Sequence, residues 1–151
     1  EAESLARQAA AAYQHLVVPD DPLLYYLCRV TLARILLAQG KFAEAVLGLC
    51  EAGQADACAR ERGWVVPGPL HRLMLLRTEA WYRLERARAA GRNSGERKRF
   101  AVEWQQKIRE CLELARTADL TDQAWKIEQS IRTADREFRP LVTEPPASDQ
   151  I

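Results

Sequence analysis

The stretch LARILLAQGKFAEA at residues 32–45 decides how this chain folds. Before Gly40, Leu32 and Leu36 lie four residues apart, so both are expected on the same face of a helix. Gly40 can adopt the left-handed conformation in which many helices end. Phe42 and Ala45 then begin a second apolar stripe. The stretch therefore predicts two antiparallel helices joined by a tight turn.

Outward from this turn, the same periodicity predicts six helices and no strand. Apolar residues recur at steps of three and four along each segment. Every proline lies between the segments or beyond them, as its missing N–H requires. The expected helices contain Leu5, Ala9, Ala12 and Leu16; residues 22–39; residues 41–62, with Phe42, Ala45, Val46, Leu49 and Cys50 inward; residues 70–90; Phe100 to Ala115; and Ala124 to Phe138, closed by Pro140.

Length and charge limit the function classes. The chain has 151 residues, of which 48% are hydrophobic, with 22 Lys+Arg against 21 Asp+Glu. This balance fits a folded domain at 1–140 followed by a proline-bearing tail or linker at 141–151, and it excludes a broadly basic nucleic-acid binder. No apolar run approaches the roughly 18 residues of a membrane span, and no signal pattern opens the chain. We therefore expect a cytoplasmic protein without a membrane partner.

The cysteines do not predict a metal site. There are four cysteines and two histidines, with no C-x-x-C pair among them. Cys50 and Cys58 would lie about 12 Å apart along one helix, which is too far for a disulfide. We expect no metal, and we expect buried free thiols in a reducing compartment.

The decisive stretch closely resembles part of a tetratricopeptide repeat, from the end of its first helix to the start of its second. Ala33 is small enough to let the paired helix approach, and Gly40 turns the chain. A second copy can be placed on residues 75–84, where Glu85 takes the place of Gly40, an offset of 85 − 40 = 45 residues. The resemblance implies an all-α, α-α superhelix of about six helices in antiparallel pairs.

Two phrases carry a narrower resemblance, LARILLAQG at 32–40 and L-x-L-A-R at 112–116. Over roughly 22–118 the chain is similar to the sensor domain of the large ATP-dependent LuxR-type bacterial transcription activators, the maltose-regulator class. In that family the domain lies between an ATPase module and a DNA-binding helix-turn-helix, senses an inducer or a partner protein, and supports self-association. No residue here matches the nucleotide-binding or DNA-binding motifs. Because the chain begins with Glu1 rather than Met, we also expect it to be part of a longer protein.

No motif predicts catalysis. The chain lacks a phosphate-binding loop, a dinucleotide fingerprint, H-E-x-x-H and G-x-S-x-G. Ser94 has no histidine in any visible relation to it and is interpreted as a loop serine. His71 is interpreted as a surface or capping residue. We expect a non-enzyme that needs no cofactor.

One predicted surface is the face that a tetratricopeptide array turns to its concave side. Arginine and tyrosine suit such a groove, because a guanidinium can hold a carboxylate through two hydrogen bonds and tyrosine offers rigid contact area. The alternative is an ordinary solvated helix face. The predicted groove residues are Arg34 in the first repeat and Arg72, Glu79, Tyr82 and Arg83 in the second.

A second surface is a basic cluster near the fourth helix end. Its cations could contact phosphates, but they also suit a helix C-terminus and an exposed loop. No aromatic residue alternates with them to stack on bases, so direct nucleic-acid binding is not favoured. The cluster comprises Arg86, Arg88, Arg92, Arg97, Lys98 and Arg99.

The tryptophans are interpreted as packing residues. Trp81 and Trp104 lie on apolar stripes and are expected in the core. Trp125 lies one position off its stripe and is expected to face a neighbouring repeat.

These features predict a non-catalytic sensor or scaffold domain of a bacterial transcriptional regulator. Its expected ligands are a protein or peptide partner or a small-molecule inducer. Two alternatives remain open: a regulatory or substrate-docking repeat domain attached to a protease or kinase, and a stand-alone adaptor.

Overall fold

The computed structural model describes residues 1–16, 22–63, 68–92 and 94–143, and within them the chain is entirely helical. The predicted all-α class is therefore confirmed, and most predicted helix ends are correct to within a residue or two. The helices are α1 (Ala2–Leu16), α2 (Pro22–Ala38), α3 (Phe42–Glu61), α4 (Pro69–Ala89), α5 (Gly95–Thr117) and α6 (Thr121–Thr143).

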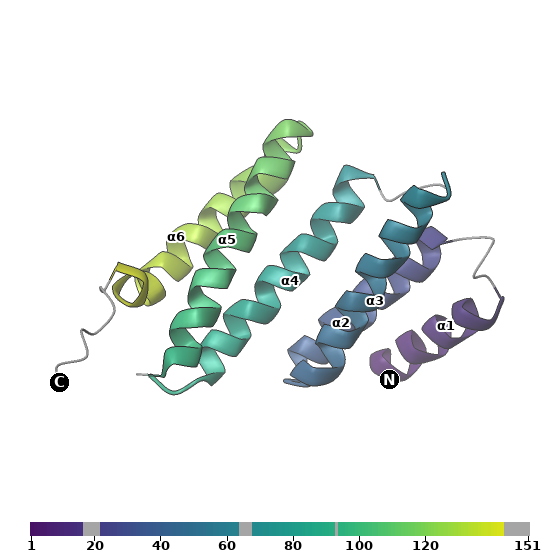
Figure 1. The fold of residues 1–151 in the computed structure, drawn as a ribbon, viewed down its shortest axis with the longest axis horizontal. Helices are drawn as coiled ribbons and strands as arrows, with labels where there is room; N and C mark the ends of the chain where they lie inside the picture. The colour runs from purple at the N-terminus through teal and green to yellow at the C-terminus, as the bar shows by residue number, and fades with distance from the viewer. Residues whose placement is uncertain (17–21, 64–67, 93, 144–151) are drawn as a thin grey trace.

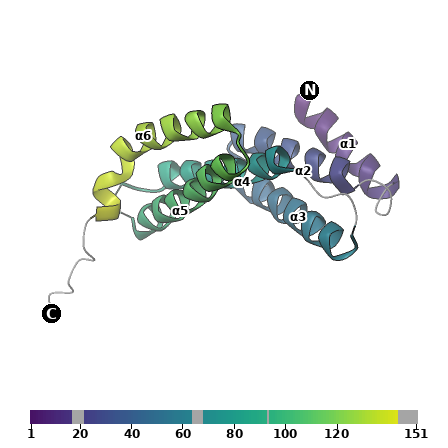
Figure 2. The same cartoon turned by 90° about the horizontal axis from the view of Figure 1, so that it is seen from above.

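Consecutive helices run in opposite directions and pack against one another (Figure 1). The closest pairs are α2 with α3 and α4 with α5, which form two hairpins. Helix α4 also contacts both helices of the first hairpin, and α6 packs on α5. Seen from above, α1 and α6 lie on one side of the molecule and α3 and α5 on the other, with α4 between them (Figure 2). Helix α4 is thus the central element.

The core lies between the helices rather than at one centre. One cluster of buried residues joins α4, α5 and α6 around Trp104 and Phe138, whose ring centroids are 6.5 Å apart. Two smaller clusters join α2 and α3 to α4. Tyr82 of α4 packs against all three clusters. Its ring meets Phe42 at 6.4 Å and Phe100 at 6.3 Å, both edge to face.

The turns form largely as the sequence predicts. Gly40 has a φ of 74° and Gly63 a φ of 66°, the left-handed conformation that glycine adopts without a steric cost. The Gly40 amide donates to Leu37 O at 3.0 Å and the Lys41 amide to Leu36 O at 2.9 Å, which is the Schellman pattern of a helix end.

Two further helix ends use residues other than glycine. Asp119 has a φ of 56° at the end of α5, and there the amide of Leu120 donates to Ala115 O at 2.8 Å. At the start of α5, the Ser94 hydroxyl accepts a hydrogen bond from the Arg97 amide at 3.1 Å. The serine interpreted as a plain loop residue is therefore the N-cap of α5.

Some expected inward positions are wrong. Leu5 of α1 is 61% exposed, and Ala6 packs against the core instead. Cys50 of α3 is exposed, whereas Leu49 beside it is buried. Each step along a helix turns the side chain by about 100°, so Ala6 and Leu49 can face the core while Leu5 and Cys50 face solvent. The expectation of buried thiols holds fully only for Cys111.

The predicted end of the last helix at Pro140 is also wrong, because α6 continues to Thr143. Proline removes one hydrogen bond to the preceding turn but does not force the chain out of helical dihedral angles. The C-terminal end of α6 turns away from the axis of the rest of the helix (Figure 2), as proline-containing helices do. Residues 144–151 of the predicted tail lie outside the described residues.

Candidate binding groove between α2, α4 and α6

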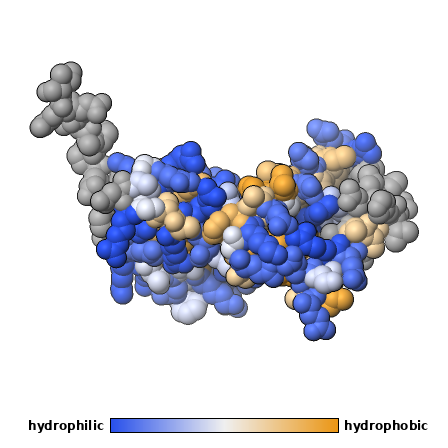
Figure 3. All heavy atoms as spheres, turned by 90° about the horizontal axis from the view of Figure 1, so that it is seen from below, coloured by the Kyte–Doolittle hydropathy of each residue, from blue (hydrophilic) through white to orange (hydrophobic). Residues whose placement is uncertain are grey.

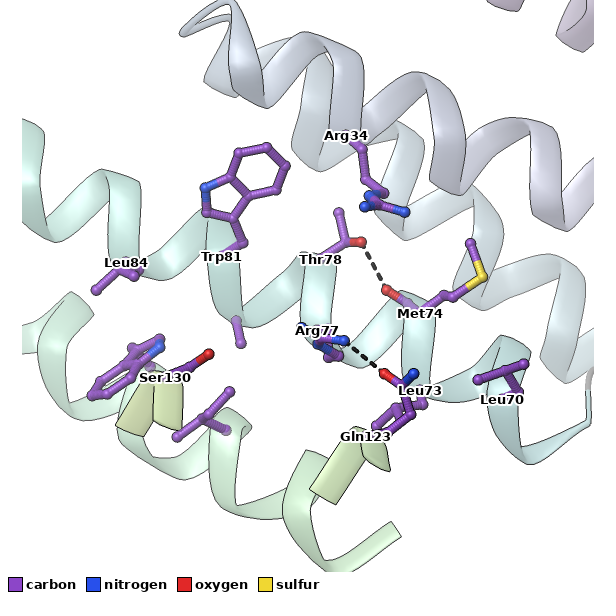
Figure 4. A pocket seen from close by; sticks show the side chains of 13 residues that line it. Arg34, Leu70, Leu73, Met74, Arg77, Thr78, Trp81, Leu84, Gln123 and Ser130 are labelled. Carbon is purple, nitrogen blue, oxygen red and sulfur yellow. Dashed lines mark hydrogen bonds between the residues drawn. The ribbon is translucent and has the colours of Figure 1, made fainter. Parts of the chain in front are cut away.

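A cavity of about 280 Å³ lies along α4, with α2 on one side and α6 on the other (Figure 4). Its lining comes from four helices, and α4 provides most of it. On α4, the lining residues recur at steps of three and four, so they share one face of the helix. The lining residues are Arg34, Leu70, Leu73, Met74, Arg77, Thr78, Ala80, Trp81, Leu84, Trp104, Ile108, Gln123 and Ser130.

One part of the cavity is apolar. Trp104 and Ile108 of α5 are only 2% and 6% exposed, so they line it from within the core. Leu84 of α4 packs against the same buried cluster, whereas Trp81 packs against the cluster of α2 and α3 and lines the cavity from that side. The indole N–H of Trp81 donates to Glu85 Oε1 at 3.3 Å. The indole is thereby held in place by its own helix.

The charged part of the cavity carries two guanidinium groups and no carboxylate. Arg77 donates to Gln123 Oε1 of α6 at 2.9 Å, which positions the guanidinium without neutralising it (Figure 4). Arg34 is exposed, and across the described parts of the chain it has no ion-pair or hydrogen-bond partner. The cavity is therefore positively charged.

The hydroxyl groups in the lining are already used as donors. Thr78 Oγ1 donates to Met74 O at 2.7 Å (Figure 4), and Ser130 Oγ donates to Lys126 O at 3.0 Å. Each hydroxyl has one hydrogen to donate. Both can accept a hydrogen bond from a ligand, but donors for a ligand must come from the arginines, from the Gln123 amide or from the indole N–H of Trp104.

Of the five predicted groove residues, Arg34 alone lines this cavity. Arg72 is exposed on α4 and does not line it. Tyr82 lies between the rings of Phe42 and Phe100, in contact with α3 and α5. Its contacts are those of a packing residue.

Glu79 and Arg83 lie against α5. Lys107 Nζ is 3.2 Å from Glu79 Oε2, and Arg83 Nε is 3.6 Å from Glu103 Oε2. Burial lowers the pKa of Lys107, but the neighbouring Glu110 and Glu79 outweigh it and leave the pKa raised. These groups join α4 to α5, so the predicted face of α4 and the face that lines the cavity do not coincide.

Arg77, Trp81 and Gln123 were not predicted as groove residues from the sequence. One signal was available in the sequence. Leu73, Trp81 and Leu84 recur at the spacing of a packed helix face, and Arg77 occupies a position in the same series. A charged residue in such a series indicates a face that is only partly covered. Gln123 gave no comparable signal, since its proximity to Arg77 depends on how α6 packs.

The basic cluster is largely paired within the molecule. Figure 3 views the end of the molecule that carries the α2–α3 turn and the α4–α5 loop, where most of the surface is hydrophilic. Several arginines of the basic cluster also lie over aromatic rings, as Arg86 does over Phe100 at 5.0 Å and Arg97 over Phe138 at 5.0 Å. Its ion pairs include Arg86–Glu96 at 2.8 Å, Arg88–Glu85 at 3.0 Å, Arg88–Glu137 at 3.3 Å, Arg97–Glu137 at 3.9 Å and Arg99–Glu103 at 3.8 Å.

The described residues provide neither a metal site nor a membrane-spanning helix. No three His, Cys, Asp or Glu side chains gather there as metal ligands, and none of these helices is long and apolar enough to cross a membrane. Burial raises the pKa of the Cys111 thiol to about 12.

No protein family, characterised protein or solved structure matches this chain.

Proposed function

We propose that this chain is a non-catalytic binding domain that works as a sensor or scaffold, with the groove between α2, α4 and α6 as its ligand-binding surface. The observation that carries the proposal is the cavity on that face. It combines an apolar floor with the guanidinium of Arg34, which has no partner in the described residues. Cavities with apolar walls and a few convergent polar groups are typical of binding sites.

The proposal includes a tetratricopeptide-like superhelix. Two helix hairpins, α2–α3 and α4–α5, lie side by side with α4 against the first hairpin. Side chains of α4 also reach α6, through Arg77 to Gln123 and Arg88 to Glu137. Close approach within the first hairpin is supported by Gly48, where an added Cβ would lie 3.6 Å from the Ala33 Cβ. Such stacking is what a helical repeat requires.

The chemistry of the cavity favours binding over catalysis. Its polar groups are two guanidiniums, an amide, two hydroxyls and the indole N–H groups of two tryptophans. General acid–base catalysis at neutral pH depends mostly on imidazole, carboxylate, amine or thiol groups. The partner we propose is a protein or peptide that lies along the groove, within a cytoplasmic regulatory protein such as a bacterial transcription activator.

Two exposed leucines provide a matched test. Leu70 lines the cavity and is 48% exposed, whereas Leu47 of α3 is 62% exposed and does not line it. A photo-cross-linking residue at position 70 would identify the partner. Leu70→Asp is then expected to weaken binding of the purified partner at least about tenfold, while Leu47→Asp leaves it unchanged. Equal loss in both variants, or in neither, with unchanged helical circular dichroism, would contradict the proposed surface.

The regulatory context is tested by the coding sequence on either side of this segment. An upstream phosphate-binding loop with a downstream helix-turn-helix is the expected arrangement. A flanking protease or kinase domain would favour the docking role instead.

A further inference from the structure

The arginines of α4 differ in how their charges are balanced. Arg83, Arg86 and Arg88 lie within 3.6 Å of the carboxylates of Glu103, Glu96 and Glu85, respectively. At the cavity, Arg77 instead meets the neutral amide of Gln123, and Arg34 of α2 lies across from it without an acidic neighbour in the lining. Two positive charges in this cavity therefore have no carboxylate partner in its lining.

The charged donors available to an anion in this lining come from the same two residues, Arg34 and Arg77. The hydroxyls of Thr78 and Ser130 already donate to the backbone of their own helices. A carboxylate in the cavity would therefore be bound by Arg34 and Arg77, whose planar guanidiniums suit two-point contact with it. Gln123 would keep Arg77 oriented.

The rest of the cavity determines what the carboxylate is attached to. Trp104 and Ile108 form an apolar floor, and Trp81 and Leu84 also line the cavity. The volume of about 280 Å³ is just below the roughly 300–1,000 Å³ of ligand pockets, so it accommodates one ring or branched chain. A longer peptide segment does not fit inside it.

We propose that this cavity binds a small organic anion, in which a single apolar ring or branched chain carries one carboxylate. The inference rests on the proposed binding role of the same groove and adds the chemical class of a small effector. The apolar group packs on Trp81 and Trp104, while the carboxylate meets Arg34 and Arg77. A ligand seated there shares the groove with Leu70, so it would regulate access of a protein partner to that surface.

The test uses 3-phenylpropionate as the probe and its neutral amide, 3-phenylpropionamide, as the matched control. Binding is followed by NMR through the indole N–H signals of a ¹⁵N-labelled chain. Trp81 and Trp104 line the cavity, whereas Trp125 is 61% exposed and does not line it. We expect the first two signals to shift with added carboxylate and that of Trp125 to stay. The amide is expected to bind at least about tenfold more weakly, because it loses the charge-assisted hydrogen bonds.

Substitutions of arginine distinguish a specific role of the two cavity guanidiniums from a general effect of net charge. Arg34→Gln and Arg77→Gln are each expected to weaken binding of the carboxylate about tenfold. Arg72→Gln removes an exposed α4 charge away from the cavity and should leave binding unchanged. Arg34 has no folded-state partner in the described residues, so its substitution tests the site even where Arg77→Gln disturbs the packing of α6.

Three outcomes would overturn the proposal: equal binding of the amide, shifts confined to Trp125, or binding of an acidic peptide with none of the free carboxylate. The partner assay at Leu70 is independent of this titration. If the anion binds but Leu70→Asp affects no partner, the proposed protein-binding role fails and the anion site stands. If partner binding depends on Leu70 but no signal shifts, the anion site fails alone.

Discussion

Tyr82 provides the sharpest test of how the two hairpins are held together. It is the α4 side chain that packs against residues of all three buried clusters, and its ring meets Phe42 and Phe100 edge to face at 6.4 and 6.3 Å. If this packing joins α2–α3 to α4–α5, removing the ring should destabilise the whole domain. If Tyr82 instead serves a ligand-binding surface, its removal should cost little stability.

The expected magnitude follows from the packing. Truncating a fully buried aromatic ring to alanine costs about 3–5 kcal/mol, which includes loss of edge-to-face contacts worth about 0.5–1.5 kcal/mol each. Tyr82 is only partly buried, so we expect Tyr82→Ala to lower the free energy of unfolding by about 3 kcal/mol. For a chain of this length, that corresponds to a fall in Tm of about 6–12 °C.

Urea unfolding followed by circular dichroism measures this change, with Tyr82→Phe as the control. The phenylalanine variant keeps the ring, and the Tyr82 hydroxyl has no hydrogen-bond partner in the described residues, so its stability should stay within about 0.5 kcal/mol of the original. A loss below about 1 kcal/mol for Tyr82→Ala, or equal losses for both variants, would refute the packing role.

Three further predictions concern a helix interior, a surface carboxylate and the thiols. Gly48→Ala should raise the free energy of unfolding by about 0.5–1 kcal/mol in urea titrations, because an added Cβ there meets only ordinary contacts, the nearest at 3.5 Å. The Glu3 carboxylate, hydrogen-bonded by Lys41 and Arg7, has its pKa lowered to about 2. NMR titration should therefore find the midpoint of the Glu3 carboxyl well below the usual value of about 4.3. The stabilisation of α1 that the carboxylate provides should be present above about pH 4.3 and lost as the pH falls toward 2. An unshifted midpoint would contradict the contacts of Glu3 with Lys41 and Arg7. Cys50 is exposed and should react readily with a thiol reagent, whereas Cys111, buried and with a raised pKa, should react only on unfolding, as mass spectrometry of the labelled peptides would show.

The helices were predictable because their signals are local. Gly40 and Gly63 mark helix ends through a backbone preference that belongs to the residue itself. The apolar series from Ala124 to Phe138 likewise identifies the buried face of α6, where Ile127 and Phe138 are fully buried. Asp119 was not predictable in this way, because an aspartate adopts the left-handed conformation only where its surroundings favour it.

The candidate site was less predictable because it depends on rotation about the helix axis. Arg34 lines the cavity as well as belonging to the predicted groove, because the turn at Gly40 fixes the register of α2. On α4 no such turn follows until Gly91, so the repeat alignment set the register without a local check. The residues it selected, Glu79 and Arg83, make their contacts with α5. Position 77 lies two residues from Glu79, a turn of about 200° around the helix, which is enough to exchange one face for the opposite one.

Helix α4 therefore has two charged faces with different roles, and the roles depend on the group that each charged side chain contacts. On the side of α5, the charges of Glu79 and Arg83 are met by Lys107 and Glu103, which fixes the hairpin and leaves little charge to attract a ligand. On the groove side, Arg77 donates a hydrogen bond to the amide of Gln123, which holds the guanidinium in position without neutralising its charge. Replacing that amide by a carboxylate should separate these roles. Gln123→Glu would pair with Arg77 and preserve the packing of α6, while anion binding in the groove falls because the charge is now balanced within the protein.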